Sequence, residues 1–299
     1  KYKIGYMKIL ITGGNGMVGK HLQEILPNAV YIGSKECDLT LWKEVEYMMF
    51  LHKPNHIIHL AAKVGGIQDN IAKPAEYFED NILINTHILK ASLQFNVKRF
   101  TGILSTCIYP DVVENYPMKE EDMFLGPPTH TNFSYGYAKR CLAVQIDAYN
   151  KQYGTKYNYL IPCNLYSEYD NFDNESKMHF MTALLKKIKS SNKTLKLLGT
   201  GKPLRQFMYA GDLARIIKEV IDKDITNSFN VATPENLSID EMANISLNIL
   251  NKKLKIEYSK PELDGQLRKD VCNKKLLSNI PHFKFTNFEE GIKKVYNNI

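Results

Sequence analysis

A tyrosine and a lysine stand four residues apart in the segment Tyr135-Gly-Tyr-Ala-Lys139. If this segment is helical, a spacing of four places both side chains on one face. A phenol with its usual pKa of ~10 is a poor acid–base group at neutral pH, and a nearby ammonium lowers that pKa. Tyr137 has no such partner, because position 141 is a cysteine. The spacing therefore predicts Tyr135 as the acid–base group and Lys139 as its partner.

A hydroxyl and a thiol lie upstream, in the segment Leu104-Ser-Thr-Cys-Ile-Tyr-Pro110. In an extended chain, residues two apart point to the same side, so Ser105 and Cys107 are expected to face one cleft. Ser105 would bind a substrate carbonyl together with Tyr135. The chain has five cysteines and no CxxC pair, which suggests neither a disulfide framework nor a metal site. The other four cysteines are interpreted as small buried hydrophobes.

A glycine-rich turn, TGGNGMVG, occupies residues 12–19. It matches both GxGxxG and GxxGxxG, and it follows a short apolar run and precedes a helical pattern. Such a turn lets the backbone approach a pyrophosphate, and the helix N-terminus offers N–H groups to the phosphates. The predicted dinucleotide site comprises Gly13, Gly14, Asn15, Gly16, Met17, Val18 and Gly19.

The end of the second predicted strand indicates which dinucleotide binds. NAD sites usually place an acidic side chain there for the ribose 2′-hydroxyl. This chain has Ser34 and Lys35 at that point, although Glu36 follows. A hydroxyl and a cation would bind a 2′-phosphate, so the segment favours NADPH. Asp38 and Leu39 are expected to flank the adenine.

Short apolar runs alternate with helical patterns to position these groups. The runs cover residues 8–12, 30–32, 56–60, 99–104 and 157–162, and the helical patterns cover 19–26, 75–94 and 135–152. Strands separated by helices of this length predict an α/β fold, a Rossmann-type doubly wound parallel sheet. Residues 1–165 are predicted to form an NADP-binding domain. Residues 166–299 are predicted to form a smaller substrate lobe, with a soft boundary that the chain can cross again.

Composition bounds the class of protein. The 299 residues are 44% hydrophobic and 24% charged, which excludes a disordered chain. No apolar run approaches the ~20 residues of a membrane-spanning helix, and residues 1–6 lack a secretory signal pattern, so a cytoplasmic protein without a membrane partner is expected. The net charge of +7 comes from scattered Lys and Arg. That pattern is typical of a solvated surface rather than a nucleic-acid interface.

These motifs together resemble the GDP-L-fucose synthase family, extended short-chain dehydrogenase/reductases that act as 3,5-epimerase/4-reductases on GDP-4-keto-6-deoxymannose. The resemblance runs from Gly13 to about Lys269. Its most specific pieces are AAKVGGI at residues 61–67, SxCIYP at 105–110, YGxAK at 135–139, Asn164-Leu-Tyr166 and Asp170-Asn-Phe172.

The resemblance implies roles for particular residues. Ser105, Tyr135 and Lys139 would carry the reduction, and Cys107 and His179 would be the base and acid of epimerisation. The implied substrate contacts are Ser105, Cys107, Asn164, Lys187, Leu198, Arg205, Asp264 and Lys269. Further implied cofactor contacts are Leu60, Ala61, Ala62, Leu104, Tyr135, Lys139, Pro162, Asn164, Leu165 and His179. A homodimer paired through helices near 75–94 and 135–152 is also implied.

The chain departs from the family pattern around the substrate: Ser167-Glu-Tyr169 replaces Gly-Pro-His, Leu198 replaces an aromatic residue, Cys163 replaces a small hydroxyl residue, and one residue is inserted between Phe172 and His179. A heptose substrate, or C4 reduction without epimerisation, also fits these residues. A nucleotide-sugar 4-epimerase or 4,6-dehydratase is a weaker alternative, because dehydratases usually carry an acidic pair where this chain has Cys107-Ile108. A non-enzymatic NADP sensor is the alternative from another class of protein. Such sensors usually lack the complete Ser/Tyr/Lys set, which this chain has.

Overall fold

Six parallel strands form the central sheet of the computed structural model, which describes residues 7–170, 172 and 178–299. The strand order is β10-β5-β4-β3-β1-β2, and each neighbouring pair runs parallel. The strands are β1 (Ile9–Thr12), β2 (Val30–Ile32), β3 (His56–His59), β4 (Arg99–Ile103), β5 (Tyr157–Pro162) and β10 (Phe229–Val231). The predicted Rossmann-type doubly wound sheet is confirmed.

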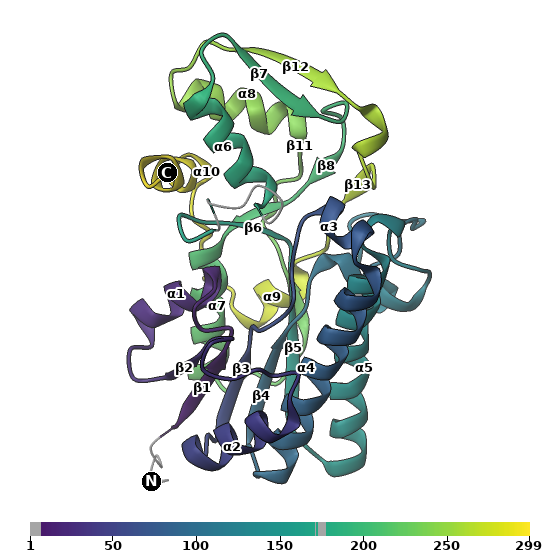
Figure 1. The fold of residues 1–299 in the computed structure, drawn as a ribbon, viewed down its shortest axis with the longest axis vertical. Coiled ribbons are helices and arrows are strands. Elements are labelled where there is room, and N and C mark those ends of the chain that lie inside the picture. Colours follow the sequence, from purple (N-terminus) through teal and green to yellow (C-terminus); the bar gives the residue numbers. More distant parts are fainter. Residues whose placement is uncertain (1–6, 171, 173–177) are drawn as a thin grey trace.

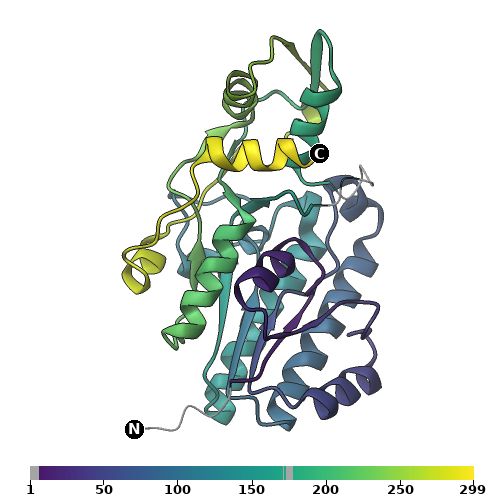
Figure 2. The ribbon, with the colours of Figure 1, turned by 90° about the vertical axis from the view of Figure 1, so that its left-hand side faces the viewer.

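Helices cover both faces of this sheet (Figure 1). One face carries α1 (Met17–Ile25) and α7 (Ala210–Asp222), which pack against each other and lie in front in Figure 2. The other face carries α2 (Trp42–His52), α4 (Pro74–Gln94) and α5 (Phe133–Tyr153). Because both faces are covered, β1 and β3 are buried along their whole length and read as unbroken runs rather than alternating ones. Helix α2 and strand β10 were not predicted from the sequence.

A smaller lobe lies beyond the carboxyl ends of the strands (Figure 1). Its strand pairs are β6 (Asn164–Tyr166) with β9 (Phe207–Tyr209), and β7 (Thr194–Leu198) with β12 (Lys255–Ser259). A third sheet orders β11 (Leu237–Ser238), β8 (Leu204–Arg205) and β13 (Arg268–Lys269). Its helices are α6 (Phe180–Ser190), α8 (Ile239–Ile249) and α10 (Phe288–Asn297).

Shorter helices lie in the connections. They are α3 (Ile67–Ala72), α9 (Lys274–Asn279), η1 (Thr106–Ile108), η2 (Glu120–Phe124), η3 (His130–Asn132) and η5 (Pro261–Leu263). None of the helices in the described part of the chain is long and apolar enough to cross a membrane.

The chain crosses between the two lobes more than once. It first leaves the larger lobe between Cys163, which packs in the main core, and Tyr166, which packs in the core of the smaller lobe. It returns for α7 and β10, and again for Val271 to Ile280. The predicted boundary near residue 165 therefore lies at the first crossing. The larger lobe also contains two later segments, one with α7 and β10 and one from Val271 to Ile280.

Candidate active site

The glycine-rich turn joins β1 to α1 at the carboxyl edge of the sheet. Gly13 has φ +70°, and a Cβ there would lie 2.8 Å from the backbone nitrogen of Ala61, so that both the conformation and the space require glycine. Helix α1 starts after Gly16, and among the described residues no side chain caps its N-terminus. The first N–H groups of a helix lack partners within it and carry positive partial charge. The turn therefore presents a backbone cradle that fits a pyrophosphate.

The loop after β2 holds the residues predicted to select the cofactor. Ser34 and Lys35 are exposed there. Glu36 accepts hydrogen bonds from the Gly33 backbone nitrogen at 2.8 Å and from Asn15 Nδ2 at 3.3 Å. Its carboxylate therefore ties this loop to the glycine-rich turn, a role that sequence reasoning did not find.

The two residues predicted to flank the adenine differ in exposure. Asp38 is exposed, and its Oδ1 accepts bonds from the Thr40 backbone nitrogen and hydroxyl at 2.9 and 2.7 Å. Leu39 is buried in the main core, and its carbonyl is bonded to His87 at 3.0 Å. Leu39 thus packs beneath the loop rather than along its surface.

A hydrogen-bonded series of buried polar side chains lies beneath the glycine-rich turn. Thr12 Oγ1 lies 2.7 Å from His59 Nδ1, and His59 Nε2 lies 3.1 Å from Asn85 Oδ1. Asn85 in turn donates to the Ala138 carbonyl at 3.3 Å. Burial, with the charge of Lys139, lowers the pKa of His59 to about 3, so His59 is neutral at physiological pH. This hydrogen-bonded series links β1, β3, α4 and α5. It was not predicted, because its residues lie far apart in the sequence and form no motif.

Lys139 is almost fully buried on α5. Its Nζ donates to the Ile103 carbonyl at 2.8 Å, at the end of β4. Burial lowers the pKa of this ammonium to about 8. The strand end therefore holds Lys139 in place beside the cofactor cradle.

Helix α5 approaches the segment after β4 very closely. A Cβ on Gly136 would lie 2.6 Å from the Cys107 carbonyl, so only glycine allows this contact. Ser105 caps η1, its Oγ accepting from the Cys107 backbone nitrogen at 3.3 Å. One turn further along α5, Arg140 donates to the Ile108 carbonyl at 2.9 Å. These contacts bring the predicted hydroxyl, phenol and thiol to one edge of the sheet.

The environment of Tyr135 differs from the prediction. Burial raises the pKa of the phenol, and the nearby Cys107 raises it further. The expected lowering of this pKa by Lys139 is not found, because burial of the phenol is the largest cause of the shift and Cys107 and Tyr77 act in the same direction. A raised pKa keeps Tyr135 protonated, which is the form a proton donor needs.

Cys107 pairs with a lysine from the smaller lobe. Lys269 Nζ on β13 lies 3.1 Å from Cys107 Sγ, although the two residues are 162 positions apart. Burial alone raises the pKa of the thiol, but Lys269, the Ser105 side chain and Arg205 together outweigh burial and lower it. Lys269, predicted as a substrate contact, is thus placed directly on the predicted base.

His179 lies at the N-cap of α6, in the smaller lobe. Its Nδ1 is 2.9 Å from Asp170 Oδ1, and its backbone nitrogen donates to Asp170 Oδ2 at 3.2 Å. The carboxylate favours a proton on Nδ1 and so orients the ring. The inserted residue noted above falls near residues 173–177, which lie outside the described part of the chain.

The predicted nucleotide-sugar contacts are spread over the smaller lobe. Asp264 accepts from the Thr200 backbone nitrogen and hydroxyl, both at 2.6 Å, and so holds the loop 199–201 that follows β7. Leu198, just before this loop, is half exposed. Lys187 on α6 donates to the Lys196 carbonyl at 3.3 Å and is otherwise exposed.

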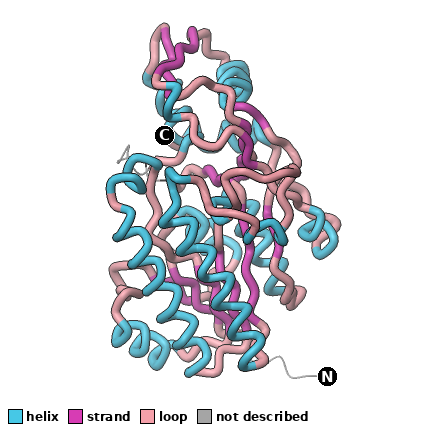
Figure 3. The backbone as a smooth tube through the Cα atoms, turned by 90° about the vertical axis from the view of Figure 1, so that its right-hand side faces the viewer, coloured by secondary structure: helices cyan, strands magenta, loops and turns pink. Residues whose placement is uncertain are grey.

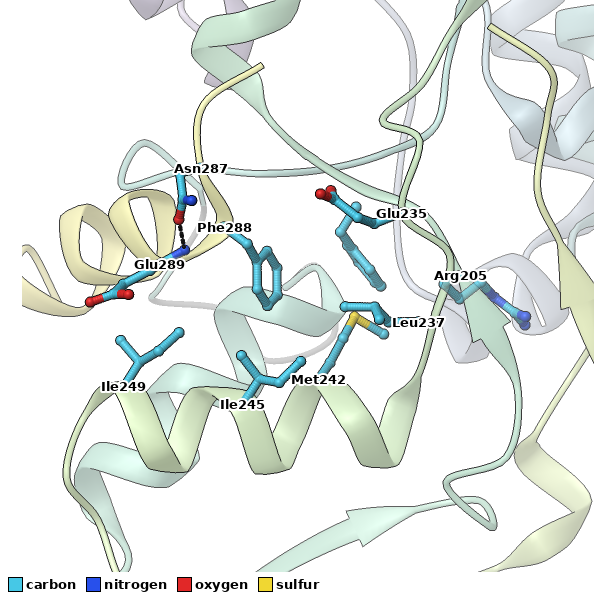
Figure 4. Close-up of a pocket in the computed structure, with 10 residues that line it drawn as sticks. Arg205, Glu235, Leu237, Met242, Ile245, Ile249, Asn287, Phe288 and Glu289 are labelled. Carbon is cyan, nitrogen blue, oxygen red and sulfur yellow. Dashed lines mark hydrogen bonds between the residues drawn. The ribbon is translucent and has the colours of Figure 1, made fainter. Parts of the chain in front are cut away.

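Arg205 lies between an apolar cavity and Cys107. The cavity, of ≈ 370 Å³, is lined mainly by apolar side chains of β11, α8 and α10. Figure 4 shows the guanidinium of Arg205 pointing away from those side chains. Burial lowers the pKa of the guanidinium, and the nearby Cys107 acts in the opposite direction and raises it. Arg205 therefore belongs with Lys269 and Cys107 rather than with the apolar cavity.

The other predicted cofactor contacts cluster at the carboxyl ends of the strands. Asn164 Nδ2 donates to the Gln206 carbonyl at 3.0 Å, joining β6 to β9. The rest follow or end strands of the main sheet or lie in β6: Leu60, Ala61 and Ala62 after β3, Leu104 after β4, Pro162 at the end of β5, and Leu165 in β6. They share one edge with the glycine-rich turn.

Comparisons with known proteins show the family to which the chain belongs. The NAD dependent epimerase/dehydratase family matches residues 9–232. A GDP-L-fucose synthase from Dictyostelium discoideum is 35% identical, over 96% of this chain and 93% of its own. The chain belongs to the GDP-L-fucose synthase family.

Two solved structures extend the comparison. A GDP-L-fucose synthetase from Naegleria fowleri, bound to NADP, has a TM-score of 0.88 and 31% identity over 98% of this chain and 92% of that one. A GDP-6-OMe-4-keto-L-xylo-heptose reductase from C. jejuni has a TM-score of 0.88 and 27% identity over 97% and 96%. The fold is thus common to fucose-type and heptose-type relatives.

At residues 167–169, where the sequence departs from the Gly-Pro-His expected from the resemblance, the chain forms a contact between the lobes. Ser167 Oγ lies 2.8 Å from Nε2 of His21 on α1. Tyr169 donates to Glu24, also on α1, at 2.7 Å, and Tyr209 donates to Glu168 at 2.6 Å. The residues at which this chain departs from the expected GDP-L-fucose synthase pattern therefore connect α1 to the segment that enters the smaller lobe.

Proposed function

We propose that this protein reduces the C4 ketone of a GDP-4-keto-6-deoxy sugar with NADPH and epimerises the sugar at C3 and C5. The observation that carries the proposal is the meeting of Ser105, Cys107 and Tyr135 at the edge where α5 contacts η1. The family membership supports the substrate class, since the D. discoideum relative is named a GDP-L-fucose synthase. The N. fowleri structure contains NADP, which supports the cofactor.

The larger lobe is proposed to hold the cofactor. The N–H groups at the start of α1 would bind its pyrophosphate, and Lys35 with Ser34 would bind the 2′-phosphate. Lys139, held by the Ile103 carbonyl, would bind the nicotinamide ribose. When bound, NADPH supplies the hydride for C4.

Reduction requires a proton at the C4 oxygen as the alkoxide develops. Tyr135 would donate it, because burial raises the pKa of its phenol and keeps the proton in place. Ser105 would donate a hydrogen bond to the same oxygen and orient the ketone. The two groups thus select the face on which C4 reacts.

Epimerisation requires a base and an acid on opposite faces of the sugar, next to the ketone that acidifies C3 and C5. Cys107, whose pKa is lowered by its cationic neighbours, would remove the proton from carbon. His179, oriented by Asp170, would return a proton from the other lobe. Arg205 and Lys187 would bind the diphosphate, since charge-assisted bonds to phosphate are short and strong.

The test is one reaction in deuterated water that contains the protein, NADPH and GDP-4-keto-6-deoxymannose. NADPH oxidation is followed by absorbance, and the product is weighed by mass spectrometry. We expect NADPH consumption with deuterium at C3 and C5. Tyr135→Phe should lower hydride transfer by about 10²–10⁴-fold. Cys107→Ser should leave reduction in place and stop the deuterium incorporation.

Each other outcome identifies an alternative. NADPH consumption without deuterium would leave a C4 reductase only. Absence of turnover with this sugar but turnover with a GDP-4-keto heptose would change the sugar and keep the reaction. Interconversion at C4 without net NADPH oxidation would indicate a 4-epimerase. No turnover with any keto sugar, together with tight NADPH binding, would favour a sensor.

A further inference from the structure

The contact between Lys269 and Cys107 joins the two lobes at the reacting edge. Cys107 belongs to η1, next to the end of β4 in the larger lobe, and Lys269 belongs to β13 in the smaller one. The Nζ–Sγ distance of 3.1 Å is that of a hydrogen bond from an ammonium to sulfur. Both side chains are only partly exposed, so that water screens the pair weakly.

Among the described residues, the groups that shift the pKa of the Cys107 thiol by charge or hydrogen bonding are cationic or neutral. Lys269 from β13 and Arg205 from β8 are the cations that face it, and Tyr135 from α5 and Ser105 are neutral at physiological pH. A thiol placed between two cations in a partly dry site ionises more readily than a free one. The charge pattern therefore suits a thiolate.

We infer that Lys269 is a positioning residue for the epimerisation base, holding Cys107 as a thiolate aimed into the site before substrate arrives. This inference rests on the proposed function for the identity of the reaction, and it gives Lys269 a role other than the predicted substrate contact. The distance and the placement across the lobes carry it.

The step balances as a proton transfer. The thiolate takes the proton from the carbon beside the ketone, the S–H bond forms as the C–H bond breaks, and the electron pair passes into the enolate. Lys269 keeps its own protons throughout. Because β13 supplies the cation, the ionisation of the thiol depends on a residue of the smaller lobe.

A stabilised thiolate is more abundant at neutral pH but a weaker base. Removing the Lys269 charge should therefore reduce deuterium exchange at neutral pH, and raising the pH should restore it. Loss of a substrate contact would act differently, because it would raise KM at every pH.

The first experiment uses the protein without substrate. Iodoacetamide is added over a range of pH, and mass spectrometry follows alkylation of the peptide that contains Cys107. In the unmodified protein we expect a midpoint below the ~8.5 of a free thiol. Half-buried Cys141 gives an internal comparison, because burial raises its pKa. A Cys107 midpoint at or above that of Cys141 would overturn the inference without any variant.

Variants separate charge from packing. Lys269→Met should move the midpoint of Cys107 alkylation to higher pH and slow alkylation at pH 7, by a factor of ten for each pKa unit that the midpoint moves. Lys269→Arg should retain most of the rate because it retains the charge. Lys253→Met, which removes an exposed lysine of the smaller lobe, is the matched control and should change nothing. An unchanged alkylation profile in Lys269→Met would overturn the inference.

A second experiment links the pair to the reaction. The rate of deuterium incorporation at C3 and C5 is measured against pH for the unmodified protein and for Lys269→Met. We expect the variant profile to move to higher pH with little change in KM. A raised KM with an unmoved profile would assign Lys269 to substrate binding instead. If the alkylation results hold but the unmodified protein exchanges no deuterium, the proposed sugar is wrong and the ion pair stands.

Discussion

Burial sets the protonation of the two reactive side chains on α5 more than their mutual charge does. Tyr135 has a raised pKa and Lys139 a lowered one, and desolvation is the main cause of both shifts. Desolvation disfavours whichever form is charged, so that it keeps a phenol protonated and weakens an ammonium. At physiological pH the cost to the free energy of folding falls on Lys139, whose charged form is buried, because the phenol of Tyr135 is neutral in both the folded and the unfolded chain.

Lys139→Met should make this cost visible. The folded protein lowers the pKa of Lys139 from 10.5 to about 8, so that below pH 8 the charged form destabilises the fold by about 3 kcal/mol. The penalty falls as the pH rises from 8 to 10.5, because the unfolded chain then keeps a proton that the folded protein loses. At pH 7 we expect the variant to melt several degrees higher and to lose reductase activity.

Calorimetry of the protein without cofactor at pH 7 and pH 10 measures both effects. The difference in melting temperature should narrow at pH 10. A variant that melts lower than the unmodified protein at pH 7 would mean that the lost bond to the Ile103 carbonyl outweighs the burial of charge.

The contact between α5 and η1 governs the site at the scale of elements. Helix α5 and η1 each carry reactive groups. The distance between the two elements is set at Gly136, which has no side chain and so allows the Cys107 carbonyl to lie close to the helix. Arg140, one turn along the same helix, donates to the Ile108 carbonyl and holds the other end of the contact. Small displacements here move the phenol relative to the hydroxyl and thiol.

Gly136→Ala should therefore impair catalysis more than folding. The new Cβ would lie 2.6 Å from the Cys107 carbonyl, and the backbone must shift to relieve it. A misplacement of this kind costs up to about 100-fold in rate, while overpacking costs about 1–3 kcal/mol of stability. Steady-state kcat for NADPH oxidation and urea unfolding measure the two effects.

Gly126→Ala is the matched control, because its Cβ would meet only the Pro110 side chain, at 3.3 Å. We expect that variant to keep its kcat. A Gly136→Ala protein with unchanged kcat would show that the separation of α5 and η1 does not control the reaction.

Across the whole molecule, α4 and α5 form one outer face of the larger lobe. The two long helices lie side by side there (Figure 3). Phe78 on α4 and Val144 on α5 are exposed, at 41% and 49%. We propose that this face pairs with its copy in a homodimer, a four-helix arrangement expected of the family.

Val144→Asp should break that dimer, because it buries a charge in an apolar contact. Sedimentation velocity at micromolar concentration should find a dimer for the unmodified protein and a monomer for the variant. Val112→Asp, at an 83% exposed valine outside these helices, should remain a dimer. An unmodified protein that sediments as a monomer would rule out the proposed assembly.

Local pattern was enough to predict most of the larger lobe and the motifs at its edge. Buried parallel strands appear as short unbroken apolar runs, and the five predicted from sequence match β1 to β5 closely. Helix α2 was missed because its exposed face carries Tyr47, Phe50 and Leu51, which blurs the amphipathic pattern. Strand β10 was missed because only three residues form it. These residues also lie within the range 166–299, which the sequence analysis assigned to the smaller lobe.

Spacing also indicated the residues that act within one turn or strand, because helices and strands repeat at fixed periods. Tyr135 with Lys139, and the glycines after β1, are of this kind. The tertiary structure decided whatever depends on approach through space. It placed Lys269 on Cys107, bonded Lys139 to the Ile103 carbonyl, and raised rather than lowered the pKa of Tyr135. Desolvation and ion pairing depend on which groups the folded chain brings together, and no sequence period records that.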